Sequence, residues 1–311
     1  MMRPVGSSGL EVAPVALGGN VFDWTADEAA SFAVLDAFVD AGGTMIDTAD
    51  VYSAWVPGHK GGESEALIGR WLRRDPAKRD RIVIATKVGY LTGLKPDTIA
   101  PACDASLARL GIDRIDLYYQ HKDDEGVPLA DSLGAFDELR RAGKIDAIGL
   151  SNFSPERVEE ALSVSIDHGF HQPVALQNWY NMVEREKFEG PLQDVAVNRG
   201  LSFFPYYSLA NGFLTGKYRS GADLGKSPRG GRSAEYLESD RGQRVLAALD
   251  DVAAQTNAAI ATVALAWTKA QPGVTAPIAS ATNTTQAQEL VAALTLELSP
   301  GQIEQLSAAS A

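Results

Sequence analysis

MIDTADVY (45–52) is the stretch that decides the fold, and IVIATK (82–87) and IDLYYQH (115–121) repeat its plan. Each begins with a short apolar, β-branched run that is typical of a buried parallel strand, and each then turns polar. In a closed parallel barrel the carboxyl ends of the strands meet at one rim, where catalytic side chains lie. We therefore expect four polar side chains to meet there as a proton-transfer site: Asp47, Tyr52, Lys87 and His121.

Strand-like and helix-like segments alternate along the rest of the chain, which predicts an all-parallel sheet. The expected strands are VALG (15–18), MID (45–47), VIATK (83–87), DLYYQ (116–120), AIGLS (147–151), VALQ (174–177), SFFPY (202–206) and APIAS (276–280). The expected helices lie near 27–41, 65–72, 98–110, 129–142, 155–168, 188–199, 242–270 and 285–294. Eight such units predict an α/β fold of the (β/α)8 TIM barrel type, formed by residues 1–311 as a single domain.

The two ends of the chain and one long segment depart from this alternation. The start, RPVGSSGLEVAPV (3–15), predicts an N-terminal β-hairpin, and LSPGQIEQLSAA (298–309) predicts an extra C-terminal helix. An insertion at about 208–240, rich in Gly, Ser and Arg from 216 onward, is interpreted as a rim loop that folds over a bound ligand. The alternative is a solvated surface insertion.

Composition limits the classes of function. The chain has 311 residues and a net charge of −12, without a dense basic patch, so it is not expected to bind nucleic acid. No long apolar span or secretory leader is seen, and Cys103 is the only cysteine, which together predict a cytoplasmic protein that does not enter the membrane. The four histidines lack metal-ligand spacing, so no metal site is expected. A monomer or small homo-oligomer that acts on small molecules fits best.

The four rim residues suit the reduction of a carbonyl group. A free phenol has a pKa of about 10, and a nearby ammonium lowers that value. Lys87 is the candidate ammonium for Tyr52, and Asp47 can hold Lys87 in place and charged. His121 can hydrogen-bond the substrate oxygen or share in the proton relay. Tyr52 would then protonate the oxygen while a hydride reaches the carbon.

Motifs along nearly the whole chain resemble those of the aldo-keto reductase superfamily. They are LGGN (17–20), DTADVY (47–52), GGESEALIG (61–69), TK (86–87), IDLYYQH (115–121), GKIDAIGLSNF (143–153), LQNWYNMVERE (176–186), YYSLANGFLTGKY (206–218) and IASATNTTQ (278–286). The resemblance implies a (β/α)8 barrel, a nicotinamide cofactor, and reversible reduction of aldehydes or ketones to alcohols. By matching position, Tyr52 is the general acid and base, with Asp47, Lys87 and His121 as its partners.

The resemblance also implies a set of cofactor-binding residues. Ser151, Asn152 and Gln177 match the residues that hold the nicotinamide carboxamide, and Tyr206 matches the ring that stacks on it. The remaining implied contacts run along the dinucleotide: Gly19, Asn20, Asp47, Tyr207, Ser208, Leu209, Asn211, Gly212, Lys217, Ser280, Thr282, Gln286 and Glu289. For Asn152 the alternative is a helix cap, and for Gln177 and Tyr206 it is packing at the barrel rim.

Two departures from the family pattern affect the cofactor. Tyr207-Ser208 replaces the commoner Ser-Pro, which changes the side chains at one expected phosphate contact. No Lys or Arg follows Lys269, although members that prefer NADPH usually place one near 280–286 to pair with the 2′-phosphate. NADPH is expected on family grounds, with Arg229 or Arg232 able to reach across, and NADH is the alternative.

Aromatic residues near the first strand ends predict the substrate pocket. Trp24, Trp55 and Tyr90 would form apolar walls around a polar centre, which suits a small or flat carbonyl compound. Two other functions stay open. One is a non-catalytic auxiliary subunit that senses a bound cofactor, and the other is a Schiff-base aldolase that uses Lys87 as an uncharged amine.

Overall fold

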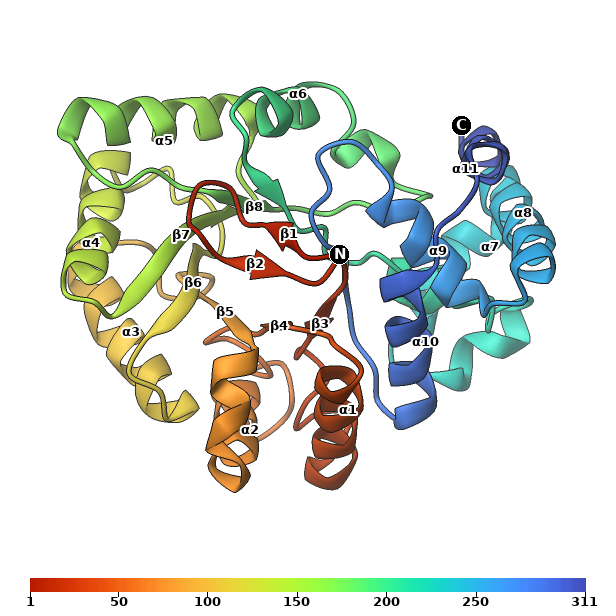
Figure 1. Ribbon diagram of the computed structural model, residues 1–311, viewed down its shortest axis with the longest axis horizontal. Helices are drawn as coiled ribbons and strands as arrows, with labels where there is room; N and C mark the ends of the chain where they lie inside the picture. Colours follow the sequence, from red (N-terminus) through yellow and green to blue (C-terminus); the bar gives the residue numbers. More distant parts are fainter.

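The computed structural model describes residues 1–311, and its centre is one sheet of eight parallel strands in the order β10-β3-β4-β5-β6-β7-β8-β9 (Figure 1). The strands are β3 (Ala16–Gly18), β4 (Met45–Asp47), β5 (Val83–Val88), β6 (Ile115–Gln120), β7 (Ile145–Ser151), β8 (Ala175–Gln177), β9 (Ser202–Phe203) and β10 (Ile278–Ala279). Each predicted strand is therefore present at its expected place in the chain.

Backbone hydrogen bonds join the two ends of this sheet. Phe203 forms a parallel bridge with Val274, and the amide of Thr275 donates to the carbonyl of Phe203 at 2.8 Å. The amide of Ile278 donates to the carbonyl of Pro205 at 2.8 Å. These contacts close the sheet on itself, and the predicted (β/α)8 barrel is confirmed.

Helices cover the outside of the barrel on all sides (Figure 1). They are α1 (Glu28–Asp40), α2 (Glu63–Arg74), α3 (Pro96–Leu110), α4 (Leu129–Arg141), α5 (Pro155–His168), α6 (Pro191–Asn198), α8 (Asp240–Thr256), α9 (Ile260–Lys269), α10 (Thr284–Thr295) and α11 (Pro300–Ala309). The helix expected at 188–199 begins only at Pro191, because Gly190 has a φ of 95° and proline then presets the first helical turn. The stretch at 242–270 is divided at Asn257, which ends α8 in the left-handed region.

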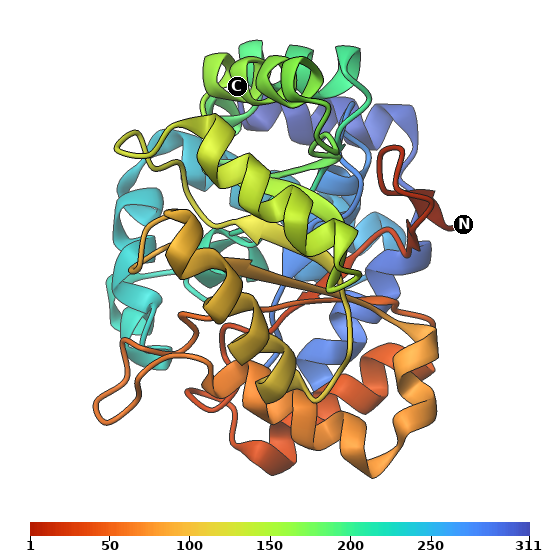
Figure 2. The same ribbon diagram turned by 90° about the vertical axis from the view of Figure 1, so that its left-hand side faces the viewer.

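The N-terminal hairpin closes the end of the barrel away from the predicted site. β1 (Arg3–Pro4) pairs antiparallel with β2 (Glu11–Val12), as expected. The guanidinium of Arg3 donates at 3.0 Å to three carbonyls, those of Lys269, Val274 and Thr275. Figure 2 shows the hairpin at one end of the molecule and the 52–62 loop at the opposite end.

The segment after β9 is built of short helical turns rather than irregular loop. It contains η3 (Ala210–Thr215), η4 (Gly221–Lys226), η5 (Gly230–Ser233) and α7 (Ala234–Glu238). The hydroxyls of Tyr218 and Ser227 are 2.6 Å apart and fasten its two halves together. No helix of the chain has both the length and the apolar character needed to cross a bilayer.

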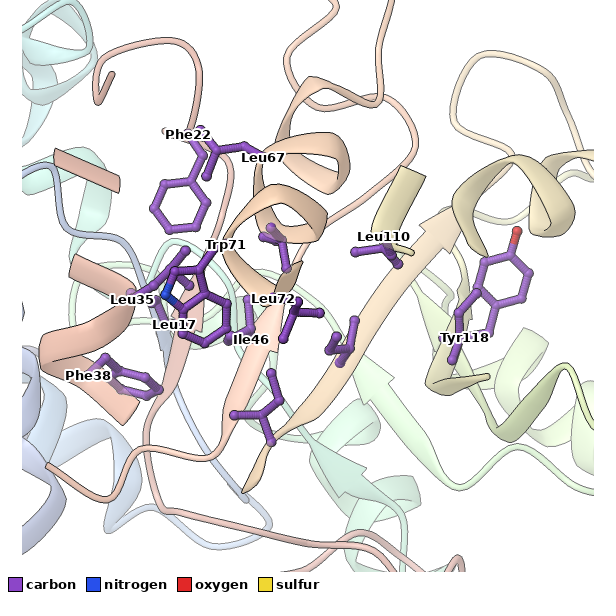
Figure 3. Close-up of a cluster of buried hydrophobic side chains, with 14 of the residues drawn as sticks. Leu17, Phe22, Leu35, Phe38, Ile46, Leu67, Trp71, Leu72, Leu110 and Tyr118 are labelled. Carbon is purple, nitrogen blue, oxygen red and sulfur yellow. The ribbon is translucent and has the colours of Figure 1, made fainter. Parts of the chain in front are cut away.

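A large apolar core fills the space between the strands and helices α1 to α4. Figure 3 shows Trp71 of α2 packed among Leu35 and Phe38 of α1 and Ile46 of β4. Trp71 is fully buried, and its indole N–H donates to Asp36 at 2.7 Å. Both the ring volume and this hydrogen bond tie α2 to α1 on the outside of β4, the strand that carries Asp47.

Replacing Trp71 by alanine is expected to lower the free energy of unfolding by about 3–5 kcal/mol, because a large cavity is left between helices and strand. Urea unfolding followed by circular dichroism measures this loss. Leu91→Ala is the control, because Leu91 is 70% exposed. Equal stability of the two variants would contradict the packing described here.

Candidate active site

The ends of β4 and β5 bring an acid, an amine and a phenol into direct contact. The ammonium of Lys87 donates to Asp47 Oδ2 at 2.7 Å, to the carbonyl of Thr48 at 2.7 Å and to the hydroxyl oxygen of Tyr52 at 3.2 Å. An ammonium has three N–H donors, so each has an acceptor. Lys87 is completely buried, and Asp47 is nearly so. This geometry fixes the amine beside the phenol.

Asp47 is held from a second side by the far wall of the barrel. Its other oxygen, Oδ1, accepts a hydrogen bond of 2.9 Å from the side-chain amide of Gln177 at the end of β8. A buried ion pair needs such additional hydrogen bonds to offset the loss of water. The sequence prediction that Asp47, Tyr52 and Lys87 meet at one mouth therefore agrees with the geometry.

Burial sets the proton affinities of this cluster. Loss of water raises the pKa of the Tyr52 phenol well above its ordinary value, and the negative charge of Asp47 adds to the rise. Burial lowers the pKa of the Lys87 ammonium, and Asp47 opposes that effect by attraction. The ammonium of Lys87 favours the phenolate, but desolvation and the negative charge of Asp47 outweigh it, so that the pKa of Tyr52 is raised overall. Tyr52 is therefore a neutral phenol at neutral pH, the form that can donate a proton.

His121, directly after β6, lies beside Tyr52 as an uncharged ring. The two ring centres are 6.1 Å apart, and His121 is only 7% exposed. Burial, and then the positive charges of Lys87 and Lys122, lower the pKa of His121 well below its ordinary value. A neutral imidazole offers a single N–H donor. His121 can therefore hydrogen-bond a carbonyl oxygen near Tyr52, whereas the alternative of a charged relay partner does not suit its surroundings.

Residues expected to hold a nicotinamide form one network at the ends of β7, β8 and β9. The amide nitrogen of Asn152 donates to the carbonyl of His121 at 2.9 Å and to Ser151 Oγ at 3.0 Å. The hydroxyl of Tyr206 donates to the amide oxygen of Asn152 at 2.6 Å. The cap of α5 is Ser154 and not Asn152, so the capping alternative for Asn152 is wrong.

The backbone after Tyr206 forms a concave run with several residues in the left-handed region. Tyr207, Ala210, Asn211 and Gly212 have φ values of 54°, 46°, 57° and 97°. Successive amides in such conformations can make an anion-binding nest. The side-chain oxygen of Asn211 is buried and has no partner, whereas the Ser208 hydroxyl donates to the carbonyl of Pro205 at 2.9 Å. The amides of Ala210 and Gly212 already donate to the carbonyls of Tyr207 and Leu209, so the side-chain oxygen of Asn211 is the group of this loop that is left for a ligand.

Positive charge accumulates beside this loop. Lys217 lies over the ring of Tyr218 at 5.0 Å and forms no ion pair. Arg232 donates to the Tyr207 hydroxyl at 3.2 Å, and Arg229 lies over the ring of Trp24 at 5.6 Å. In a chain with a net charge of −12, these three cations form no ion pair with a carboxylate and are left to attract an anion.

The expected adenosine end lies around the start of α10. Ser280 donates to Asn20 Oδ1 at 2.6 Å, which ties β10 to the end of β3. Gln286 accepts from the amide of Thr282 at 2.9 Å and from its hydroxyl at 3.1 Å. Glu289 lies further along, in a depression of about 580 Å³ between α9 and α10. These residues lie in one region, where Thr282 and Gln286 already hydrogen-bond each other.

The structure gives Gly19 a packing role in addition to the cofactor contact that was expected of it. Its amide donates to the carbonyl of Asp47 at 2.7 Å, and its carbonyl accepts from Ser64 Oγ at 2.8 Å. A Cβ at this position would lie 2.8 Å from Ser64 Oγ, so a larger residue would push β3 away from α2. The structure thus accounts for a glycine here through the close approach of the chain.

Aromatic rings lie around Tyr52 and His121 at the barrel mouth. Trp55 lies 5.8 Å from Tyr52 and 5.5 Å from Trp24, in edge-on contacts. Tyr90 lies 4.9 Å from His121 on the other side. Trp55 and Tyr90 are 47% and 46% exposed. Phe22, two residues before Trp24, lies fully buried in the core (Figure 3).

Two residues of the motif LQNWYNMVERE support the site without having been singled out. Asn181 is fully buried and donates to the carbonyl of Tyr207 at 3.0 Å, which holds the concave loop in place. Trp179 packs edge-on against Tyr207 at 5.0 Å. In the sequence, the sign of this supporting role is an asparagine inside an aromatic motif. Its spacing alone does not reveal which group it binds.

Replacing Lys87 by methionine is expected to destabilise the fold by about 3–5 kcal/mol, because Asp47 would keep a buried charge without a counterion. The double variant Asp47→Leu/Lys87→Met is expected to be less destabilised, since neither charge remains. Urea unfolding compares the two, and a Lys87→Met protein as stable as the wild type would show that the pair is not buried as described.

Comparison with known proteins agrees with the fold and identifies the family. The model of the family described as "Aldo/keto reductase family" matches residues 14–311. The chain is 31% identical to the Bacillus subtilis protein named uncharacterized oxidoreductase YrpG, over 94% of this chain and 91% of that one. It is 31% identical to protein tas of Escherichia coli, over 97% and 95%. It is 30% identical to L-glyceraldehyde 3-phosphate reductase of Escherichia coli O157:H7, over 94% and 87%. The chain therefore belongs to the aldo/keto reductase family.

Proposed function

We propose that the protein is a nicotinamide-dependent carbonyl reductase in which Tyr52 is the general acid. The contact that carries the proposal is the ammonium of Lys87, 3.2 Å from the Tyr52 hydroxyl oxygen and 2.7 Å from Asp47. It holds the phenol at the mouth and stabilises negative charge as the proton leaves. Membership in a family of oxidoreductases supports the same reading.

Each residue at the mouth has its own role in proton transfer. Tyr52 donates its hydroxyl proton to the carbonyl oxygen of the substrate, and the N–H of neutral His121 positions that oxygen. The developing phenolate is stabilised by Lys87, whose own charge Asp47 and Gln177 hold in place. General acid catalysis of this kind contributes about 10²–10⁴-fold to the rate. In the reverse direction Tyr52 takes the proton of the alcohol.

The rim fits a bound dinucleotide at three places along the barrel mouth. The amide groups of Asn152 and Gln177 provide both donors and acceptors for a carboxamide. The buried, unpartnered oxygen of Asn211, in the loop at 207–212, can accept a hydrogen bond from a hydroxyl of the dinucleotide, and Lys217 supplies a cation without a carboxylate partner. A nicotinamide held there would supply the hydride. We propose that the cofactor is NADPH and that cations of the rim segment pair with its 2′-phosphate in place of a Lys or Arg near 280–286. NADH is the alternative to be tested.

The mouth supports small or flat carbonyl substrates. Trp24, Trp55 and Tyr90 leave apolar surface around the polar cluster, and apolar walls with few polar groups are the usual composition of small-molecule sites. One relative is named as the reductase of an aldehyde. We infer that aldehydes are the first substrates to test.

A Schiff-base role for Lys87 is disfavoured by its contacts. Attack on a carbonyl needs an uncharged amine, whereas Lys87 donates to a carboxylate and a backbone carbonyl at 2.7 Å each. Both acceptors favour the ammonium. No contact in the structure favours the non-catalytic auxiliary role over the enzyme.

Tyr52→Phe is expected to reduce kcat for aldehyde reduction by about 10²–10⁴-fold, because the proton donor is lost while the ring remains. Binding of the reduced cofactor, followed by tryptophan fluorescence, should stay unchanged. Tyr90→Phe is the matched control and is expected to keep most of its activity. Full turnover by Tyr52→Phe would remove Tyr52 from its proposed role.

Lys217→Met is expected to weaken binding of both NADPH and NADH about tenfold, since a charged contact to the shared pyrophosphate contributes about 1.5 kcal/mol or more. Fluorescence titration measures each affinity, and the wild type should bind NADPH more tightly. Lys187→Met, at an exposed position, is the control. A loss confined to NADPH would move Lys217 to the 2′-phosphate, and unchanged affinities would exclude it from the cofactor site.

A further inference from the structure

One carboxylate beside the loop that carries Tyr52 has no part in the mechanism above. Glu63 is the first residue of α2, and its side chain accepts hydrogen bonds from three backbone amides of that loop. Its Oε1 accepts from Lys60 at 2.8 Å, and its Oε2 accepts from Gly61 at 3.0 Å and from Ser53 at 3.3 Å. One side chain therefore joins the two ends of the loop.

These contacts fix the backbone directly after the phenol. Ser53, which follows Tyr52 in the chain, is fully buried, and its hydroxyl donates to the carbonyl of Phe22 at 3.2 Å. The carbonyl of Tyr52 accepts from the amide of Gly62 at 2.8 Å. The carbonyl of Tyr52 and the amide of Ser53 are thus both held by the start of α2.

The same loop carries part of the aromatic mouth. Trp55 lies two residues after Ser53 and makes edge-on contacts with Tyr52 and Trp24. The amides that Glu63 binds lie on both sides of Trp55 in the chain. Glu63 therefore restrains this ring as well as the phenol.

A carboxylate suits this position. Both of its oxygens only accept hydrogen bonds, whereas a glutamine would turn N–H donors toward the loop amides. The first turn of a helix also favours an anion, because its free amides carry partial positive charge. Burial raises the pKa of Glu63, but the amides that it binds outweigh this effect and lower the pKa overall. Glu63 therefore stays ionised at neutral pH.

A surface charge at the start of a helix is the alternative interpretation, and Glu28 is an example of one. Glu28 is the first residue of α1, its side chain is 52% exposed, and it pairs with Arg70 at 2.6 Å. Glu63 differs from it, because all three hydrogen bonds of Glu63 go to the backbone that carries the proton donor.

We propose that Glu63 is a positioning residue that fixes the loop after β4, and with it the Tyr52 phenol, for proton transfer. This inference rests on the proposed role of Tyr52 as proton donor. Without the carboxylate, three amides lose their acceptor and the loop moves more freely. The phenol then spends less time within reach of the substrate oxygen. The expected carboxamide contacts at the ends of β7, β8 and β9 lie on other strands and keep their places.

Glu63→Gln is expected to lower kcat for aldehyde reduction by up to about 10²-fold, the loss that a misplacement of about 1 Å can cause. The KM for the aldehyde should rise, because Trp55 moves with the loop, and the affinity for NADPH, measured by fluorescence titration, should stay unchanged. Glu28→Gln is the matched control and should keep the wild-type values. Glu63→Asp keeps the charge with a shorter reach and should fall between the two.

A double variant separates positioning of the phenol from general damage. If Glu63 acts through Tyr52, adding Glu63→Gln to Tyr52→Phe should cost little further rate. Hydrogen exchange of the Ser53, Lys60 and Gly61 amides, followed by NMR, reads the loop without any turnover. These amides should be protected in the wild type and should exchange faster in Glu63→Gln, or in Glu63→Asp if the glutamine variant does not fold.

Wild-type kcat in Glu63→Gln, unchanged exchange of the three amides, or an equal loss of rate with and without the Tyr52 hydroxyl would overturn the proposal. A loss of rate that is matched by weaker NADPH binding would also overturn it, because the damage would then reach beyond the loop. Failure of the proposed function is distinguishable, since it would appear as full turnover by Tyr52→Phe while amide exchange still depended on Glu63.

Discussion

The rest of the site depends on one buried ion pair, Lys87 with Asp47. Removing two charges from water is costly, and the pair is tolerated because all of its hydrogen-bonding groups are used. Lys87 donates to Asp47, to a backbone carbonyl and to Tyr52, while Gln177 binds the second oxygen of Asp47. The pair thereby links the ends of β4, β5 and β8 across the barrel mouth. The pair also bears on the protonation state of Tyr52. Because Asp47 balances the charge of Lys87, Tyr52 stays a neutral phenol rather than a phenolate.

The barrel makes this arrangement possible by placing residues distant in the sequence at one rim. Strand closure between Phe203 and Thr275 fixes the circumference, and the hairpin seals the other end. The rim is then free to carry polar groups and loops. Asn152 and Asn181 show the consequence, since each joins its own strand end to a neighbouring one by a side-chain hydrogen bond. Tyr206 in turn joins the end of β9 to that of β7. A ligand held along this rim would meet a surface that is already organised.

Much of the fold and the meeting of these side chains could be predicted from the sequence, because local residue patterns mark the strands. Short apolar runs such as those ending at Asp47, Lys87 and His121 mark strands, and parallel strands must share one carboxyl end. The meeting of Asp47, Tyr52 and Lys87 followed from that. The pKa of Tyr52 could not be predicted, because it depends on burial and on the balance between Lys87 and Asp47, which only three-dimensional packing reveals. For the same reason the packing role of Gly19 and the loop support from Asn181 were missed, because each rests on a partner far along the chain.

The charge on Lys87 at neutral pH is the claim on which the account depends, and carbon and nitrogen NMR of selectively labelled lysine measures it directly. The account predicts the signal of an ammonium for Lys87 in the wild type, and loss of that charge in Asp47→Asn, where burial is no longer opposed by a carboxylate. A neutral amine signal for Lys87 in the wild type at neutral pH would contradict it.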